Sequence, residues 1–115
     1  MATIVPVRVD RPDGGVIITW TNLVNSTSDV GRAVYIGDLD DVSVQAVGTS
    51  ATTCIIQGSN DGTSFNILGA GVTVTVGATG NSPVLPLLAK PMFLRPATPS
   101  AASDTDIIVV GARRR

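Results

Sequence analysis

An all-β fold, an antiparallel β-sandwich or jelly roll of about eight to ten short strands, is predicted for this chain of 115 residues by three features. Val, Ile and Thr make up about a third of the sequence and recur in short alternating runs, which favours pleated, half-buried strands. Clusters of Gly, Asn, Asp, Ser and Pro interrupt these runs roughly every ten residues. No stretch combines a helical period with good helix formers, since Glu is absent and Lys occurs once.

The first two expected strands are residues 3–9 and 16–23. In the first, Pro6 cannot donate a ladder hydrogen bond, so this run is an edge strand or an extended arm. Residues 10–15, which read Asp-Arg-Pro-Asp-Gly-Gly, form a turn before the second strand. That strand carries the only Trp, Trp20.

The middle of the chain predicts four more strands, at residues 32–37, 42–48, 52–58 and 65–68. An acidic turn that holds Asp38, Asp40 and Asp41 precedes the second of these. Between the last two, the sequence Ser-Asn-Asp-Gly at 59–62 is a strong hairpin signal, because Asn and Asp tolerate left-handed backbone angles and Gly prefers them.

The last third predicts strands at residues 71–76, 84–90, 92–95 and 106–112. Alternating Val and Thr mark the first, Pro86 interrupts the second, and a run of Ile and Val forms the last. The chain is short enough for one domain. We expect a sandwich over residues 15–112, an arm or edge strand over 1–14, and a basic tail over 113–115.

The low aromatic content predicts an aliphatic core. Its few large anchors are expected to be Trp20, Tyr35, Phe65 and Phe93, although Trp20 could instead serve an interface. Cys54 lies in an apolar, strand-like run, so we interpret it as a small buried hydrophobic residue rather than a reactive thiol.

Residues suited to catalysis are scarce. The chain has no His and no Glu, so no Ser-His, Cys-His or His-metal arrangement is possible, and no phosphate-binding Gly pattern occurs. Asp38, Asp40 and Asp41 are conceivable Ca²⁺ ligands, but the residue spacing of a calcium-binding loop is missing, so a solvated turn is favoured. We therefore expect no enzyme, no metal and no cofactor.

Charge is distributed unevenly along the chain. Three of the eight basic residues are Arg113, Arg114 and Arg115, which leaves five basic and nine acidic groups in the rest, a net charge of −4. This balance favours binding neither to nucleic acid nor to a membrane. A basic tip on an acidic body indicates either docking onto an acidic neighbour or a frayed, solvated terminus. Residues 1–6 lack the features of a secretory signal, so we expect synthesis in a cytoplasm.

Two resemblances add to these observations. The segment from Ile55 to Phe65, a strand followed by a Ser-Asn-Asp-Gly turn and an aromatic residue, resembles a hairpin of discoidin-type, galactose-binding-like jelly rolls. The segments 93–96 and 107–113 are similar to the closing hairpin of that family. This resemblance covers the second half of the chain and implies a jelly roll.

The whole chain, with its size, its Ala/Gly/Thr/Val-rich composition, its Ser-Asn-Asp-Gly hairpin and its Arg-rich end, resembles structural proteins of tailed bacteriophages. It is most similar to auxiliary capsid proteins of the decoration or cement class. That resemblance implies a virion protein that binds the outer surface of an assembled shell. Its partners would be the major capsid protein and copies of itself, with a trimer favoured.

The segments most expected to bind a partner are the N-terminal arm and the basic tail; the candidate residues are Ile4, Val5, Arg8, Arg11, Arg113, Arg114 and Arg115. Alternative functions are a carbohydrate- or host-surface-binding module and a tail, neck or head-fibre component. A sugar site would use Trp20 with Asn22, or Phe65 with Asn60 and Asp61.

Overall fold

The computed structural model describes residues 3–24, 29–48, 52–67, 73–76, 84–87, 91–97 and 105–113, which form strands and turns. Within these ranges no helix is long and apolar enough to cross a membrane. The strands are β1 (Thr3–Ile4), β2 (Val7–Asp10), β3 (Gly15–Leu23), β4 (Val30–Gly31), β5 (Val34–Tyr35), β6 (Leu39–Gly48), β7 (Thr52–Ser59), β8 (Asn66–Ile67), β9 (Thr73–Val76), β10 (Leu85–Pro86), β11 (Phe93–Pro96) and β12 (Thr105–Arg113). The all-β prediction is confirmed.

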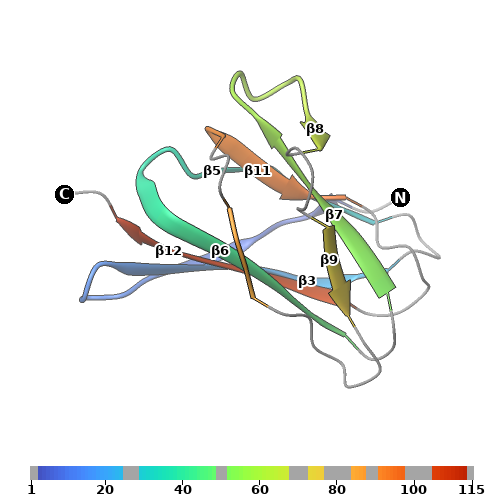
Figure 1. Cartoon of the computed structure of the whole chain (residues 1–115), viewed down its shortest axis with the longest axis horizontal. Helices are drawn as coiled ribbons and strands as arrows, with labels where there is room; N and C mark the ends of the chain where they lie inside the picture. Colours follow the sequence, from blue (N-terminus) through green and yellow to red (C-terminus); the bar gives the residue numbers. More distant parts are fainter. Residues whose placement is uncertain are drawn as a thin grey trace.

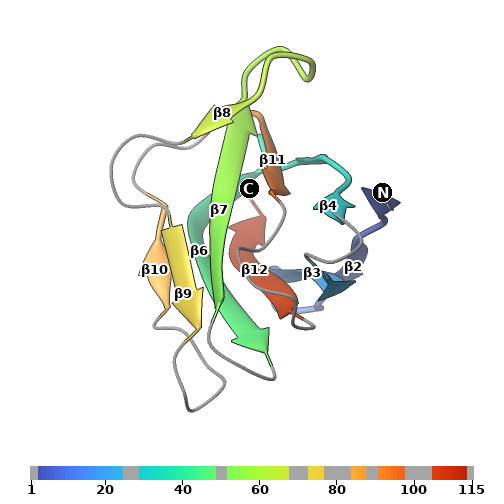
Figure 2. The same ribbon diagram turned by 90° about the vertical axis from the view of Figure 1, so that its right-hand side faces the viewer.

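Two antiparallel sheets form the sandwich (Figure 1). The sheet with the order β10-β6-β12-β3-β2 is called the long sheet below, and the sheet with the order β5-β11-β7-β8, with β9 also paired to β7, is called the short sheet. In the long sheet β12 pairs with β3 on one side and β6 on the other, and β2 and β10 are the edge strands. Figure 2 shows β12, β3 and β2 on one side of the interior and β11 and β4 on the other. β1 and β4 form a small parallel pair.

The core lies between the two sheets and is aliphatic, apart from one indole. Alternate residues of each strand point inward because side chains alternate between the two faces of a strand. The inward residues, all less than 5% exposed, are Val16, Ile18 and Trp20 of β3, Val42, Val44 and Ala46 of β6, Cys54 and Ile56 of β7, Leu94 of β11, and Ile107 and Val109 of β12. This alternation fixes which residues face outward and are available to a partner.

Trp20 is a core anchor, as predicted. It is fully buried, and its Nε1 donates a hydrogen bond to the carbonyl oxygen of Arg32 over 2.9 Å. The prediction for Tyr35 is wrong, because its side chain is 44% exposed. Leu94 takes the inward position of β11, so its neighbour Phe93 points outward and meets Tyr35 edge to face, with ring centroids 5.5 Å apart. Phe65 and Phe93 are only partly buried.

Two strand boundaries differ from the sequence-based expectation. The run 3–9 is divided at Pro6, which cannot donate to a sheet, into β1 and β2. β6 begins at Leu39, three residues earlier than expected, within the acidic turn. There the register with β12 shifts between Val110 and Ala112, a β-bulge, and Asp41 has the left-handed φ of 52°.

Other expected elements are shorter in the structure. Residues 32–37 contribute only β5, and 84–90 contribute only β10, with 88–90 outside the described residues. The hairpin predicted around 59–62 is confirmed: β7 and β8 pair antiparallel, and Gly62 has a positive φ of 83°.

The interpretation of Cys54 as a buried hydrophobic residue is confirmed. The side chain is fully buried, and Sγ donates to the carbonyl oxygen of Ala97 over 3.1 Å. Burial raises the pKa of the thiol to about 12, so it stays protonated and unreactive at neutral pH.

Candidate functional site

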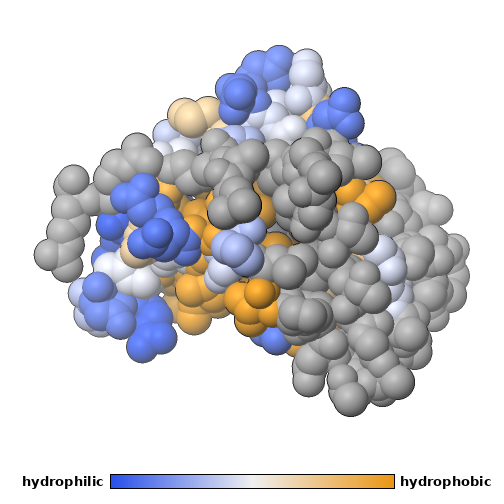
Figure 3. All heavy atoms as spheres, in the orientation of Figure 1, coloured by the Kyte–Doolittle hydropathy of each residue, from blue (hydrophilic) through white to orange (hydrophobic). Residues whose placement is uncertain are grey.

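The two segments that the sequence predicted as partner-binding meet at one end of the long sheet. Arg113, at the end of β12, donates from Nη2 to the carbonyl oxygen of Arg11 over 3.0 Å. Its backbone N–H donates to the carbonyl oxygen of Gly14 over 2.8 Å, within the turn between β2 and β3. We call this region the charged end, and it comprises Arg8, Asp10, Arg11, Asp13, Asp38 and Arg113. Hydrophilic groups gather there at the left of Figure 3.

Asp10 connects two strands of the charged end. Its Oδ1 accepts from Nε of Arg8 over 2.8 Å, and its Oδ2 lies 3.1 Å from Nη1 of Arg113. Arg8 also reaches Oδ2 of Asp38 over 3.0 Å, in the turn before β6. The hydrogen bond from Arg8 lowers the pKa of Asp10, and the hydrogen bonds to Asp10 and Asp38 raise the pKa of Arg8. These groups therefore stay charged at neutral pH and are poor proton donors or acceptors.

Arg11 is the most available cation of the three described arginines in this region. Its side chain is 57% exposed, and its ion pair with Asp13 is long, at 3.6 Å. Asp13 has a second role, since its Oδ1 accepts the backbone N–H of Gly15 over 2.9 Å. Arg11 can therefore turn to an external carboxylate with little disturbance of the turn.

The structure separates the remaining candidates. Ile4 is half-buried against the core, and its carbonyl oxygen accepts from the backbone N–H of Arg32 over 2.9 Å. Val5 is exposed, next to β2. Arg114 and Arg115 lie outside the described residues.

The acidic residues before β6 do not converge as ligands. Asp38 pairs with Arg8, while Asp40 and Asp41 belong to the first residues of β6. Across the described parts of the chain, no group of three or more acidic, Cys or His side chains could hold a metal ion.

One surface was missed by the sequence analysis. The side of the long sheet that faces away from the core carries two rows of side chains that follow the strand register: Val7, Thr19 and Ile108 in one row and Val9, Ile17 and Val110 in the other. We call these six residues the aliphatic face. A signal was present in the sequence, because consecutive apolar residues, as in 16–18 and 107–110, are typical of strands that are covered on both sides.

The hairpin turn at the far end of the molecule uses its polar groups internally. Oδ1 of Asp61 accepts the backbone N–H groups of Thr63 and Ser64, over 2.9 and 2.8 Å, and the hydroxyl of Ser59 over 2.7 Å. These bonds, that from Ser64 foremost, hold the pKa of Asp61 far below its usual range. The amide oxygen of Asn60 accepts from the backbone N–H of Met92 over 3.3 Å.

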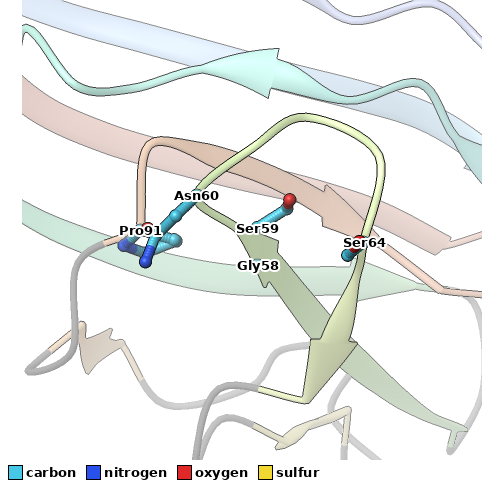
Figure 4. A pocket seen from close by; sticks show the side chains of 5 residues that line it. All are labelled: Gly58, Ser59, Asn60, Ser64 and Pro91. Atoms are coloured by element: carbon cyan, nitrogen blue, oxygen red, sulfur yellow. The ribbon is translucent and has the colours of Figure 1, made fainter.

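An open hollow of about 240 Å³ lies beside this turn, lined by Gly58, Ser59, Asn60, Ser64 and Pro91 (Figure 4). No aromatic side chain lines it. Phe65 has one ring face under the guanidinium of Arg95, which lies 4.1 Å from the ring centroid. Trp20 is buried, so the proposed sugar platform of Trp20 with Asn22 is wrong. At the other proposed platform, beside Phe65, the carboxylate of Asp61 is bonded within the turn and the amide oxygen of Asn60 is bonded to Met92.

Replacing Asp61 with alanine is expected to lower the melting temperature by a few degrees at neutral pH, because three donors lose their acceptor. A carboxylate with a lowered pKa stabilises the fold above its ordinary pKa of 3.8, and that stabilisation is lost as the pH falls below this value. Asp61→Asn keeps an acceptor oxygen, so it should lose less stability than Asp61→Ala at neutral pH and approach the wild type in acid. Melting curves at neutral and acidic pH measure both effects, and an unchanged melting temperature for Asp61→Ala contradicts this role.

Comparisons with known proteins assign no family. No family model and no curated protein sequence matches the chain. Among solved structures, one similar fold is a protein from Neisseria meningitidis, with 11% sequence identity, coverage of 93% of this chain and 81% of the other, and a TM-score of 0.44. Another is a cupin domain from Bordetella pertussis Tohama I, with 9% identity, coverage of 99% of this chain and 96% of the other, and a TM-score of 0.42. A pre-peptidase C-terminal domain of collagenase from Bacillus anthracis is also similar, with 13% identity, coverage of 96% of this chain and 94% of the other, and a TM-score of 0.47. Because these sequence identities and TM-scores are low, the structural similarities support no conclusion about the activity of the chain.

Proposed function

We propose that this chain is a structural protein of a bacteriophage particle, of the decoration or cement class, which binds the outer surface of an assembled shell and stabilises it. The resemblance in size and composition favours this function. The observation that carries it is the charged end, where residues from both ends of the sequence meet and an exposed arginine is available. The geometry favours binding, because the carboxylate that bridges the two strands is held in its ionised form.

The charged end supplies an electrostatic contact. Its described members balance three arginines against three aspartates, and Arg114 and Arg115 follow directly in the sequence. Arg11, whose side chain is the most exposed of the three described arginines and whose ion pair is long, is the cation that fits an acidic group on a capsid subunit. One such contact is weak, but many copies on a regular lattice bind with high total strength.

Arg11→Ala, combined with removal of residues 114 and 115, is expected to weaken binding to empty shells by about tenfold or more, since several charge-assisted contacts are lost. The shells are assembled from the major capsid protein encoded with this chain, and bound protein is quantified by co-sedimentation. Binding of the wild type should also decrease as the salt concentration rises.

Arg32→Ala is the matched control, because Arg32 is also exposed but lies outside the charged end. It should bind shells like the wild type. Full occupancy by the charged-end variant, or equal losses in both variants, would show that this region is not the contact.

A further inference from the structure

The aliphatic face is exposed and carries no charge. Val7, Val9 and Val110 are 61%, 51% and 43% exposed, and Ile17 and Ile108 are partly exposed between them. The charged residues of the adjacent edge strand, Arg8 and Asp10, lie on the opposite side of the sheet, in register with the inward residues of β3. The exposed side of an antiparallel sheet is normally polar, so these rows are unusual.

The apolar surface continues beyond the edge strand across the centre of the sheet. β12 pairs with both β3 and β6, which places Val110 and Ile108 in the middle. On β6 the outward partners of these two residues are Ser43 and Gln45, which are polar but uncharged. An acidic or basic partner surface would find no opposite charge on these rows, whereas another uncharged β-branched surface would pack well.

We propose that the aliphatic face binds a second copy of this chain, sheet against sheet. At about 3.3 Å per residue and about 4.8 Å between strands, the whole outward side of β6, β12, β3 and β2, of which the aliphatic face is a part, measures on the order of 500 Å². Side-chain relief raises the accessible area of this side towards the lower end of the about 600–1,000 Å² that each partner buries in a stable complex. The contact therefore has to cover this whole side of the sheet.

A flat face that contacts the same face of another copy closes with two-fold symmetry, so this contact makes a dimer in place of the expected trimer. These rows also let two copies meet without placing like charges opposite each other, because neither row contains a charged side chain. The charged end of each copy lies at one end of the sheet, beside the contact. The dimer would thus present two charged ends.

Val110→Lys tests this inference. A lysine in the middle of the contact would bury an unpaired ammonium, so the dissociation constant of the dimer is expected to rise by about 100-fold. Met92→Lys is the matched control, because Met92 has a similar exposure of 40% but precedes β11 in the short sheet. Sedimentation equilibrium of the wild type and both variants gives the dissociation constants. Circular dichroism shows whether Val110→Lys is folded.

Cross-linking provides a second measurement that does not depend on a destabilising charge. In Val110→Cys the new thiols would face each other near the symmetry axis, while buried Cys54 remains unreactive. A short bis-maleimide should therefore link Val110→Cys into covalent dimers and leave Met92→Cys monomeric.

A monomeric wild type, or equal self-association of Val110→Lys and the wild type, would overturn the inference. So would a trimer whose cross-linking is the same in the two cysteine variants. These measurements contain no shells, so self-association can succeed or fail independently of the proposed role in capsid decoration.

Discussion

Trp20→Ala is expected to lower the free energy of unfolding by about 3–5 kcal/mol, the largest effect of any single substitution considered for this protein. The side chain is fully buried between the sheets, and its removal leaves a cavity that the surrounding aliphatic side chains cannot fill. The carbonyl oxygen of Arg32 also loses its donor. Since small domains are stable by only about 5–15 kcal/mol, this loss is a large fraction of the total stability.

Urea denaturation followed by circular dichroism measures this loss. Trp20→Phe serves as the comparison, because phenylalanine retains much of the volume and lacks only the N–H donor and part of the ring. It should therefore lose clearly less stability than Trp20→Ala. A loss below about 1 kcal/mol for Trp20→Ala would mean that the indole does not hold the two sheets together.

Gly31→Ala is expected to be the second most damaging change, at about 1–3 kcal/mol. A Cβ at this position would overlap the ring of Pro96 and lie 2.9 Å from Cδ1 of Trp20. Both neighbours are buried, so neither can move without disturbing the packing between β4, β11 and β3. The same urea titration measures the effect.

Gly14→Ala separates this steric effect from backbone strain. Gly14 has a positive φ of 93°, but nothing lies within 4 Å of the position of its Cβ. That substitution should cost only about 1 kcal/mol, from the strained backbone alone. If Gly14→Ala destabilises the protein more than Gly31→Ala, the close approach at Gly31 is not a determinant of stability.

The sequence predicted the fold class and most strands because period-two alternation and turn residues act locally. It predicted burial of Trp20 and Cys54 for the same reason. It failed for Tyr35, because the choice between inward and outward positions depends on register with β11, a strand far away in the chain. It also failed at the start of β6, where a bulge opposite β12 extends pairing into an acidic segment.

The candidate site was predictable in part. The arginines near both ends of the chain could be identified by charge, but their meeting depends on β3, the strand that β2 and β12 both pair with. No local pattern could show that Asp10 bridges Arg8 and Arg113. The aliphatic face was easier to find in principle. The consecutive apolar residues 107–110 form a central strand, and a strand of this type that packs on only one side leaves the other for a partner.

The proposed contacts divide the surface of the molecule between two partners. The aliphatic face would join two copies, and each copy would keep its charged end for the shell. A dimer with two weak electrostatic contacts can bridge neighbouring capsid subunits, and binding then depends on the spacing of those subunits. Free subunits offer no such spacing.

The central claim, that the chain acts by binding a protein lattice through its surface, is tested most directly by comparing assembled shells with unassembled major capsid protein. Sedimentation of the wild-type protein with each, at equal subunit concentrations, measures the bound fraction. The account predicts saturable binding to assembled shells and much weaker binding to free subunits. Binding to neither, or equal binding to both, would contradict it.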